Sequence, residues 1–452
     1  MAADTSKSLR NQVIYSVFVR NYSQEGTFRK VEEDLDRIRE LGTDIIWLMP
    51  IHPVGEKHRK GSLGSPYAIR DYRAVNPEYG HMEDFIRLCH AIHEHGMKVI
   101  IDVVYNHTSP DSVLASAHPE WFFHKADGSF GNKTGDWWDV IDLDYSPETN
   151  RDWRGLWDYQ IETLQMWARF VDGFRCDVAA MVPLPFWLEA REKIEQVRPG
   201  AIWLAESVEP EFVVCNRSRG IACSSDAELY QAFDLCYDYD IYGLMNGVLT
   251  GRVPLADYAA AVNRQEGMYP DNYGKARFLE NHDRLRAAFL LPDERARRNW
   301  TAFCYFQKGT TLVYAGQERS AAHTPSLFDR DTVNWEGTDI SVLMRRLSDI
   351  RHRPEFTDST YRVTALAHDV CAAVHTPKRY SPVEGAEDGS GLHRMLGVFS
   401  LRGESSVLSM DRIGGKPVPD GMYTNLIDGS PVEINMGEMA VTGEPVILEI
   451  PG

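Results

Sequence analysis

Apolar positions in the first hundred residues follow two alternating patterns. Short apolar runs, suited to strands buried on both faces, occupy Val13–Val19, Asp44–Met49 and Val99–Val104. Between them, Phe28–Leu41 and Met82–His95 place apolar side chains at the three- and four-residue spacing of one helix face, and a glycine follows each. The chain therefore begins as a repeat of strand, loop and helix, which predicts a parallel sheet with right-handed crossovers.

The same alternation continues to about residue 360. Helical patterns such as Phe186–Val197 separate most of five further strand candidates, which are Phe174–Asp177, Ile202–Ala205, Phe233–Cys236, Ala276–Leu279 and Thr311–Tyr314. Eight parallel strands with intervening helices are typical of a (β/α)8 barrel, and we predict this α/β fold, a TIM barrel. An open doubly wound sheet is the alternative, but no glycine-rich phosphate-binding sequence follows the first strand.

Two segments depart from the alternation. Thr108–Asp152, between the third and fourth strands, is rich in aromatic residues and Asp and is far longer than an ordinary loop, so we expect an inserted lobe. After about residue 360, short β-like runs separated by Gly and Pro predict a C-terminal antiparallel β-sandwich; they are Val370–His375, Met395–Leu401 and Pro445–Ile450. The predicted domains are the barrel at 1–107 and 153–360, the lobe at 108–152 and the β domain at 361–452.

The composition of the chain limits the kinds of partner that we expect it to bind. The 452 residues carry a formal charge of −18, which argues against nucleic acid or an anionic membrane as a partner and suits a neutral ligand. Seven cysteines lack any paired metal-binding spacing and are interpreted as reduced thiols. The N-terminal residues contain no apolar signal segment, and no apolar run is long enough to span a bilayer. We expect a cytoplasmic protein, and its oligomeric state stays open.

The segment Val171–Val178 contains an unusual charged pair. Side chains alternate along a strand, so Arg175 and Asp177 face one way, opposite to Phe174, Cys176 and Val178, while Gly173 lets a neighbouring backbone approach. A buried charged pair is costly unless the two groups satisfy each other. Taken alone, the pair is equally compatible with a structural ion pair at a strand end.

Other strands also end in polar residues. The third ends in Asn106-His107, the fifth in Glu206, and the seventh in Asn281-His282-Asp283. The active sites of such barrels lie at these C-terminal strand ends. A single His or Asp there is more often a cap or a satisfied buried group, but three carboxylates beside an arginine and two histidines indicate an active site.

These four segments resemble the signature regions of the α-amylase family of glycoside hydrolases. Tyr67 with Asp71, and Gly316-Gln317-Glu318 after the eighth strand, extend the resemblance over roughly residues 13–340. It implies Asp177 as the nucleophile, Glu206 as the general acid/base, Asp283 as the transition-state stabiliser and Arg175 as the group that keeps the nucleophile ionised. It further implies substrate contacts from His107 and His282 to sugar hydroxyls, from Tyr67 under the sugar ring, and from Arg330 to a more distal sugar.

Elementary chemistry agrees with these roles. Cleaving an acetal requires an ionised carboxylate on one side of the sugar and a protonated acid beside the leaving oxygen. The positive charge of Arg175 is expected to lower the pKa of Asp177. Apolar neighbours in Trp203-Leu204-Ala205 are expected to raise the pKa of Glu206 toward the range that an acid needs.

The sequence departs from typical secreted family members in three places. Ala180 and Met181 stand where a Lys-His pair is common, which leaves fewer polar contacts for the leaving group. Arg330 lacks a clear Asp partner. Asn106 and Asp142 match positions that bind calcium in such enzymes, but two oxygen ligands do not make a Ca²⁺ site, so a structural Ca²⁺ is only a hypothesis. The chemistry itself requires no cofactor.

We expect a retaining α-glycosidase acting on α-linked glucosides, in particular short malto-oligosaccharides. One alternative is a transglycosylase or glycosyltransferase of the same family, for which the basic run Lys57–Lys60 near Tyr67 would meet a phosphorylated donor. The other is a non-catalytic carbohydrate-binding relative, which the retention of all three carboxylates argues against.

Overall fold

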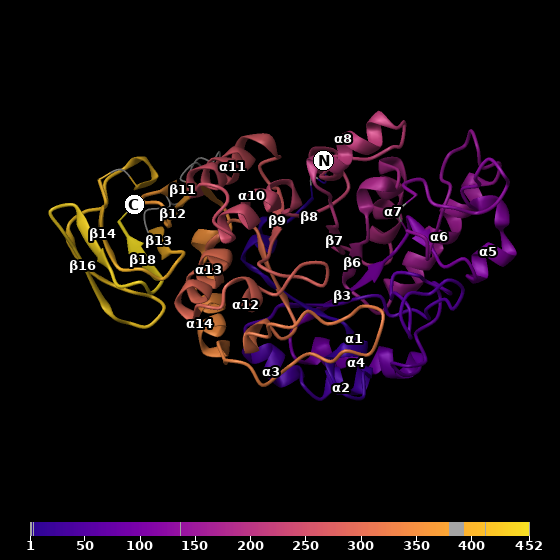
Figure 1. Cartoon of the computed structure of the whole chain (residues 1–452), viewed down its shortest axis with the longest axis horizontal. Coiled ribbons are helices and arrows are strands. Elements are labelled where there is room, and N and C mark those ends of the chain that lie inside the picture. The colour runs from indigo at the N-terminus through magenta and orange to yellow at the C-terminus, as the bar shows by residue number, and fades with distance from the viewer. Residues whose placement is uncertain (1, 3, 136, 379–392, 412, 452) are drawn as a thin grey trace.

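Eight parallel strands close into a barrel in the computed structural model, which describes residues 2, 4–135, 137–378, 393–411 and 413–451 (Figure 1). Each barrel strand pairs with the barrel strands that come before and after it in the sequence. The last barrel strand pairs with the first, which closes the barrel. The strands are β1 (Val13–Val17), β2 (Ile45–Leu48), β3 (Lys98–Val103), β6 (Gly173–Cys176), β7 (Ile202–Ala205), β8 (Leu235–Tyr237), β9 (Gly274–Arg277) and β10 (Thr310–Tyr314). The predicted (β/α)8 barrel is confirmed.

Helices surround the barrel and connect its strands. They are α1 (Val19–Tyr22), α2 (Phe28–Glu32), α3 (Leu35–Glu40), α4 (Met82–Glu94), α6 (Trp153–Trp167), α7 (Leu184–Glu195), α8 (Pro210–Ser218), α9 (Asp226–Leu229), α10 (Tyr239–Leu249), α11 (Leu255–Met268), α12 (Ala287–Leu290), α13 (Glu294–Phe306) and α14 (Ser341–Arg351). None of these, in the described part of the chain, has the length and apolar character that a bilayer-spanning helix needs.

The helix predicted over Phe28–Leu41 is wrong in one respect, because two helices share that range. The break falls at Asp34, whose carboxylate accepts hydrogen bonds from Arg37, at 2.6 Å, and from the Tyr22 hydroxyl. An Asp side chain that bonds to nearby groups competes with a continuous helix. The apolar face is nevertheless kept across the break, since Phe28 and Ile38 are both fully buried.

Two predicted strands are shifted in the structure. Phe233–Cys236 is replaced by β8, which begins at Leu235, because the Asp234 side chain accepts the N–H of Trp203 at 2.8 Å just before it. Ala276–Leu279 is replaced by β9, which ends at Arg277. Phe278 lies beyond the last paired residue and packs against aromatic rings, so it belongs to the core rather than to the ladder.

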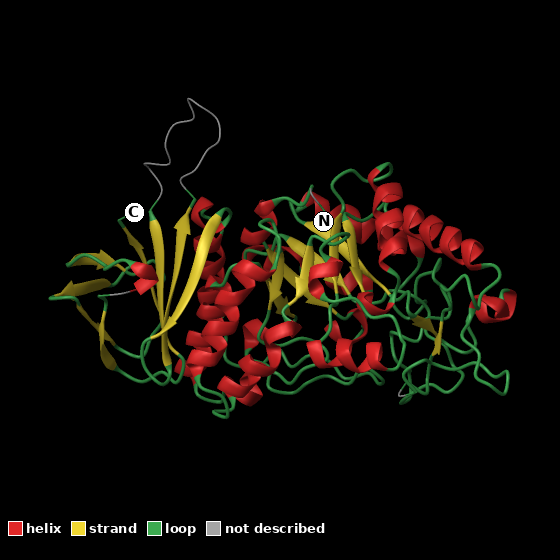
Figure 2. Ribbon diagram, turned by 90° about the horizontal axis from the view of Figure 1, so that it is seen from above, coloured by secondary structure: helices red, strands yellow, loops and turns green. Residues whose placement is uncertain are grey.

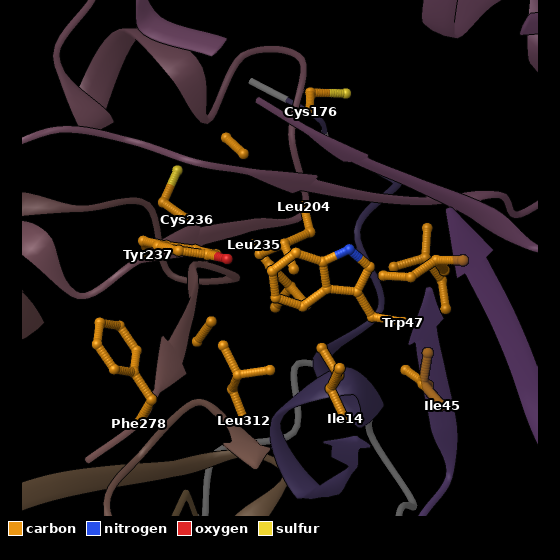
Figure 3. Packing of buried hydrophobic residues seen from close by; sticks show 14 of the residues in the cluster. Ile14, Ile45, Trp47, Cys176, Leu204, Leu235, Cys236, Tyr237, Phe278 and Leu312 are labelled. Carbon is orange, nitrogen blue, oxygen red and sulfur yellow. The ribbon is translucent and has the colours of Figure 1, made fainter. Parts of the chain in front are cut away.

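The barrel interior is filled with apolar side chains (Figure 3). Residues that are at most 1% exposed include Ile14, Trp47, Leu204, Leu235 and Leu312. The Trp47 ring lies edge-on to His282, with ring centres 5.6 Å apart. The top of the packed core therefore supports the polar residues at the C-terminal end of the barrel directly.

The inserted lobe leaves the barrel immediately after the third strand. It contains β4 (His107–Thr108), α5 (Val113–Ala117) and β5 (Ile141–Asp142). The two short strands pair antiparallel, with His107 opposite Asp142. The lobe is thus joined to the barrel at a residue that the sequence places in the candidate site.

The C-terminal part consists of two four-stranded antiparallel sheets at one end of the molecule (Figure 2). One contains β11 (Ser359–Ala365), β12 (Val370–Pro377), β13 (Arg394–Ser400) and β18 (Val446–Ile450), and the other β14 (Ser406–Ser409), β17 (Glu438–Val441), β16 (Pro431–Asn435) and β15 (Gly421–Thr424). Apolar residues of both sheets, among them Leu396, Leu408 and Met439, form a second core. The predicted antiparallel β-sandwich is confirmed.

Candidate active site

A cavity of about 420 Å³ opens at the C-terminal ends of the barrel strands. Its walls come from the segments after β2, β3, β6, β7, β8 and β9, together with the lobe and the loop after β10. Six residues predicted from the sequence line it: Tyr67, His107, Asp177, Glu206, His282 and Asp283. The fold therefore gathers side chains that are spread over more than two hundred residues of sequence.

Arg175 lies beneath this cavity, fully buried, and contacts three carboxylates. Strand register places Asp102 of β3 opposite Arg175 of β6. The Arg175 Nη1 donates to both oxygens of Asp102, at 2.9 and 3.0 Å, and to Asp177 Oδ1 at 2.8 Å. Its Nη2 forms an ion pair of 3.0 Å with Glu206 Oε2. One buried guanidinium thus orients the predicted nucleophile and the predicted acid at once.

Sequence reasoning did not select Asp102 as a site residue, although it is the only charged residue in the apolar run Val99–Val104. It is fully buried and also accepts a hydrogen bond from the Tyr67 hydroxyl at 3.1 Å. The aromatic faces of Trp47, Tyr67 and Tyr237 lie 5.0, 5.7 and 5.4 Å from the Arg175 guanidinium carbon. The sequence feature that could have identified Asp102 is a charged residue inside an otherwise apolar strand, because a buried charge is costly unless it is paired.

The two carboxylate oxygens of Asp177 differ in their hydrogen bonding, since only Oδ1 accepts a bond from Arg175. Its Oδ2 has no hydrogen-bond partner in the described part of the chain, and His107 Nε2 lies 3.8 Å from it. Burial raises the pKa of Asp177 to about 6, with Arg175 acting in the opposite direction. The lowering of the pKa by Arg175 that the sequence predicts is present, but removal of the carboxylate from water is the larger effect, so the pKa of Asp177 is raised.

The carboxyl group of Glu206 has a different hydrogen-bond partner from that of Asp177. Its Oε2 accepts the backbone N–H of Val178 at 2.8 Å. Burial raises the pKa of Glu206 to about 7, Arg175 opposes the rise, and the negative charges of Asp177 and Asp283 add to it. The upward direction predicted from its apolar neighbours is confirmed, and it favours a protonated carboxyl group near neutral pH.

The turn after β6 explains the link between these two carboxyl groups. Val178 was predicted to lie in the strand, but β6 ends at Cys176 and Val178 has φ 40° and ψ 43°. This left-handed conformation is unfavourable for a β-branched residue. Val178 lies beyond the last residue of β6, and its N–H donates to the Glu206 side chain instead of to a strand partner.

Asp283 lies at the mouth of the cavity with 40% of its side chain exposed. Enclosure by the walls raises its pKa, but the neighbouring His282, first among several cationic groups, outweighs this and lowers the pKa to about 2. The His282 Nε2 lies 3.1 Å from Asp283 Oδ2 and 2.7 Å from the Tyr67 hydroxyl. Asp283 is therefore an anion across the whole pH range in which Asp177 and Glu206 titrate.

Comparison with known proteins identifies the family of this chain. The family model described as "Alpha amylase, catalytic domain" matches residues 12–349, and "Bacterial Alpha amylase C-terminal domain" matches residues 364–448. The chain belongs to the α-amylase family of glycoside hydrolases. The family predicted from the four motifs is confirmed.

Solved α-amylase structures share the whole architecture. An α-amylase from Lactobacillus plantarum is 44% identical, with a TM-score of 0.90, over 98% of this chain and 99% of that one. A noncanonic maltogenic α-amylase, AmyB from Thermotoga neapolitana, is 32% identical, with a TM-score of 0.82, over the same shares of the two chains.

Curated relatives are longer proteins. An α-1,4-glucan:maltose-1-phosphate maltosyltransferase from Salinibacter ruber is 32% identical over 212 residues, which is 42% of this chain and 31% of that protein. The α-amylase MalA from Haloarcula japonica is 27% identical over 358 residues, which is 76% of this chain and 49% of that protein. The matched segments thus span 31% and 49% of these two relatives, so this chain covers at most about half of their length.

Arg330, which the resemblance implied for a distal sugar, lies outside the cavity, and so do Ala180 and Met181, which stand where a Lys-His pair is common. Arg330 points to the loop after α1, where its Nη1 donates to the carbonyl oxygens of Gln24 and Glu25 at 2.8 and 3.0 Å. Ala180 and Met181 are 2% and 7% exposed. Met181 instead borders a separate groove of about 1140 Å³ beside the lobe. The structure does not bring these three together with the carboxylates.

The residues considered for calcium do not fit that ion. The Asn106 side chain pairs with the ring of His107 at 3.2 Å, and one oxygen of Asp142 accepts the backbone N–H of Lys133 at 2.7 Å. The other Asp142 oxygen is buried without a hydrogen-bond partner among the described residues. The positive charge of Lys133, whose Nζ lies 3.4 Å from the carbonyl oxygen of Leu143, already acts on the Asp142 carboxylate. Calcium takes six to eight oxygen ligands, and this pair supplies one free carboxylate oxygen beside a cation.

Several cavity residues follow the predicted motifs by a few positions and were missed for that reason. Arg284 comes directly after Asp283, stacks over the Tyr239 ring with its guanidinium carbon 4.5 Å from the ring centre, and pairs with Glu209. Extending each motif by three residues would have found both members of this ion pair. Lys60, Asp139 and Phe328 also line the cavity.

Proposed function

We propose that this protein hydrolyses α-glucosidic bonds in short malto-oligosaccharides by a retaining double displacement. The observation that carries the proposal is the shared guanidinium of Arg175, which holds Asp177 and Glu206 close together at the end of the cavity. The pKa values of about 6 and about 7 allow Asp177 to be ionised while Glu206 is protonated. Retaining enzymes need this combination on two adjacent carboxyl groups.

The reaction has two steps. Glu206 gives its proton to the glycosidic oxygen while the free Oδ2 of Asp177 attacks the anomeric carbon, which breaks the bond to the leaving sugar and forms a glycosyl ester. The ionised Glu206 then takes a proton from water, whose oxygen attacks the same carbon and releases Asp177. The negative charge of Asp283, which its partner His282 helps to keep ionised, stabilises the positive charge that develops on the sugar ring in this proposal.

The size of the cavity supports a short substrate. A volume of about 420 Å³ lies toward the lower end of ligand pockets, which range from roughly 300 to 1,000 Å³. The charge of −18 suits a neutral oligosaccharide and no nucleic acid. All seven cysteines are unpaired and six are buried, which supports our proposal that the enzyme works in the reducing cytoplasm.

Hydrolysis of maltotriose, followed by NMR of the first anomer released, tests this function. We expect an α-anomer from the wild type, and a loss of at least about 100-fold in kcat for Asp177→Asn, because an amide cannot form the ester. Asp127→Asn, an exposed lobe residue, is the matched control. A β-anomer as first product, or a nearly active Asp177→Asn variant with unchanged circular dichroism, contradicts the assignment.

Glycosyl transfer is the second candidate, because the relative from Salinibacter ruber and others like it are named maltosyltransferases. Incubation with maltose 1-phosphate and maltotetraose distinguishes the two reactions. Chain elongation by two glucose units with release of phosphate would identify a transferase. Reducing sugar formed from maltotriose without elongation identifies a hydrolase.

A further inference from the structure

An ion pair spans one side of the catalytic cavity. Lys60 Nζ lies 2.7 Å from an oxygen of Asp139, and both residues line the cavity. The Asp139 side chain is only 4% exposed and that of Lys60 is 25% exposed. The same ammonium lies 5.5 Å from the centre of the Trp138 ring and 5.7 Å from that of Phe328. Three chain segments therefore meet at one cation.

The segment that carries Lys60 is firmly attached to the loop after β10. Leu63 donates its N–H to the carbonyl oxygen of Phe328 at 2.9 Å, and Ser62 donates its N–H to Asp329 at 2.8 Å. Buried Arg20 donates to the carbonyl oxygens of Gly64 and Leu327, at 2.9 and 3.2 Å. Lys60 then extends from this assembly to Asp139 of the lobe and completes a continuous wall.

The position of the wall relative to the carboxylates decides which end of a substrate it meets. The loops that build it follow β2, β3 and β10, the same side of the barrel as Tyr67 and His107. His107 lies directly beside it, with its ring centre 5.3 Å from that of Trp137. The opposite side is built by loops after β7 and β9, where Arg284 pairs with Glu209 next to the proposed acid, Glu206.

In the proposed reaction the acid protonates the leaving sugar, so the side of Arg284 and Glu209 receives the leaving group. The side of Tyr67 and His107 then receives the sugar that becomes attached to Asp177. The unreacted chain beyond that sugar leads to the non-reducing end of a malto-oligosaccharide. The wall therefore faces the non-reducing end of the substrate.

We propose that the Lys60–Asp139 ion pair closes the donor end of the cavity and restricts the enzyme to cleavage near the non-reducing end of the chain. The inference deepens the proposed function and rests on it. A substrate enters with its non-reducing end against the pair, and a chain that continues past this point meets the wall instead of open solvent. Lys60 and Asp139 are specificity-determining residues in this account.

The pairing also bears on the basic run Lys57–Lys60, considered above as a site for a phosphorylated donor. The charge of Lys60 is already neutralised by a nearly buried carboxylate, so a phosphate would have to displace Asp139 and leave it unpaired. Truncating either partner leaves the other side chain without its counter-charge and opens the wall. The two single variants are thus expected to have the same effect on substrate choice.

A pair of heptasaccharide substrates tests the inference. One is maltoheptaose with a free non-reducing end, and the other carries an ethylidene acetal across the 4- and 6-hydroxyls of that end. We expect the wild type to favour the free substrate strongly, because the acetal adds bulk where the cavity is closed. Lys60→Ala and Asp139→Ala are each expected to raise the ratio of kcat/KM, blocked to free, by about tenfold or more.

Lys57→Ala is the matched control, because it removes a neighbouring exposed lysine that does not line this cavity. Equal cleavage of both substrates by the wild type overturns the inference and leaves the proposed hydrolysis intact. An unchanged ratio in both variants, with unchanged circular dichroism and melting temperature, overturns it as well. Failure of the wild type to cleave either substrate overturns the proposed function itself.

Discussion

At the scale of single residues, the site depends on the guanidinium group of Arg175, which pairs with three carboxylates. Arg175 contacts Asp102, Asp177 and Glu206 within 3.0 Å and is fully buried. Three carboxylates around one cation cannot all be ionised cheaply in a buried site, so the pKa values of all three are raised, with burial as the first cause. The arrangement keeps a proton within the cluster at neutral pH.

The first prediction concerns the pH dependence of kcat/KM. Activity requires ionised Asp177 and protonated Glu206, so it falls below about pH 6 as Asp177 gains a proton and above about pH 7 as Glu206 loses one. Glu206→Gln should abolish the alkaline fall while retaining weak activity on aryl glucosides with good leaving groups. If the alkaline fall persists in this variant, another group is the acid.

A second prediction isolates Asp102, the site residue missed from the sequence. Its negative charge raises the pKa of Asp177, so Asp102→Asn should move the acidic fall of kcat/KM to lower pH, by about one pH unit. A purely structural residue would lower kcat or stability without moving the pH profile. The matched control is Asp127→Asn, an exposed change that leaves the profile in place.

At the scale of elements, β6 and the turn after it have the strictest requirements. Gly173 begins β6, and a Cβ at this position would overlap the backbone of Ile202 on the neighbouring strand β7. The close approach anticipated from the sequence is confirmed. The strand pairing fixed there carries Arg175, two residues later, to its place opposite Leu204 of β7.

Gly173→Ala should therefore destabilise the protein by about 1–3 kcal/mol, because the added methyl group forces two strands of the barrel apart. Gly243→Ala in α10 is the control, since a Cβ there meets no atom within 4 Å and alanine favours helix. Urea unfolding of both variants measures the difference. Equal stability of the two variants would show that the barrel adjusts without cost.

At the scale of the whole molecule, the C-terminal sheets are attached to the barrel through its outer helices. Asn263 of α11 donates to the carbonyl oxygen of Val363 and accepts its N–H, both at 2.8 Å. These two hydrogen bonds satisfy the backbone N–H and carbonyl group of Val363, which lies in β11, an edge strand of its sheet. His375 of β12 adds a hydrogen bond of 2.8 Å to the carbonyl oxygen of Phe306 in α13.

Asn263→Ala should lower the free energy of unfolding by about 1–3 kcal/mol, since both groups of Val363 lose their partner in a partly buried place. Arg264→Ala, on the exposed side of the same helix, should have no comparable effect. Calorimetry would also show whether the sheets and barrel unfold in separate steps. A melting temperature unchanged by Asn263→Ala would mean that apolar packing alone holds the two parts together.

The order of elements and the chemistry of the site were readable from the sequence because both are local. Buried strands require apolar runs, helices require one apolar face, and carboxylates such as Asp177 follow strand ends directly. The sequence alone thus determined the barrel, the lobe, the C-terminal sheets and the three carboxylates. Motifs of this kind also identified the family.

The tertiary structure decided everything that depends on distance between remote residues. Register set Asp102 opposite Arg175, and burial, not the nearby arginine, set the direction of the pKa of Asp177. The ion pair between Lys60 and Asp139 joins loops that are far apart in the chain. Local sequence patterns do not predict such contacts, because the contacts form only when strands from different parts of the sequence pack side by side.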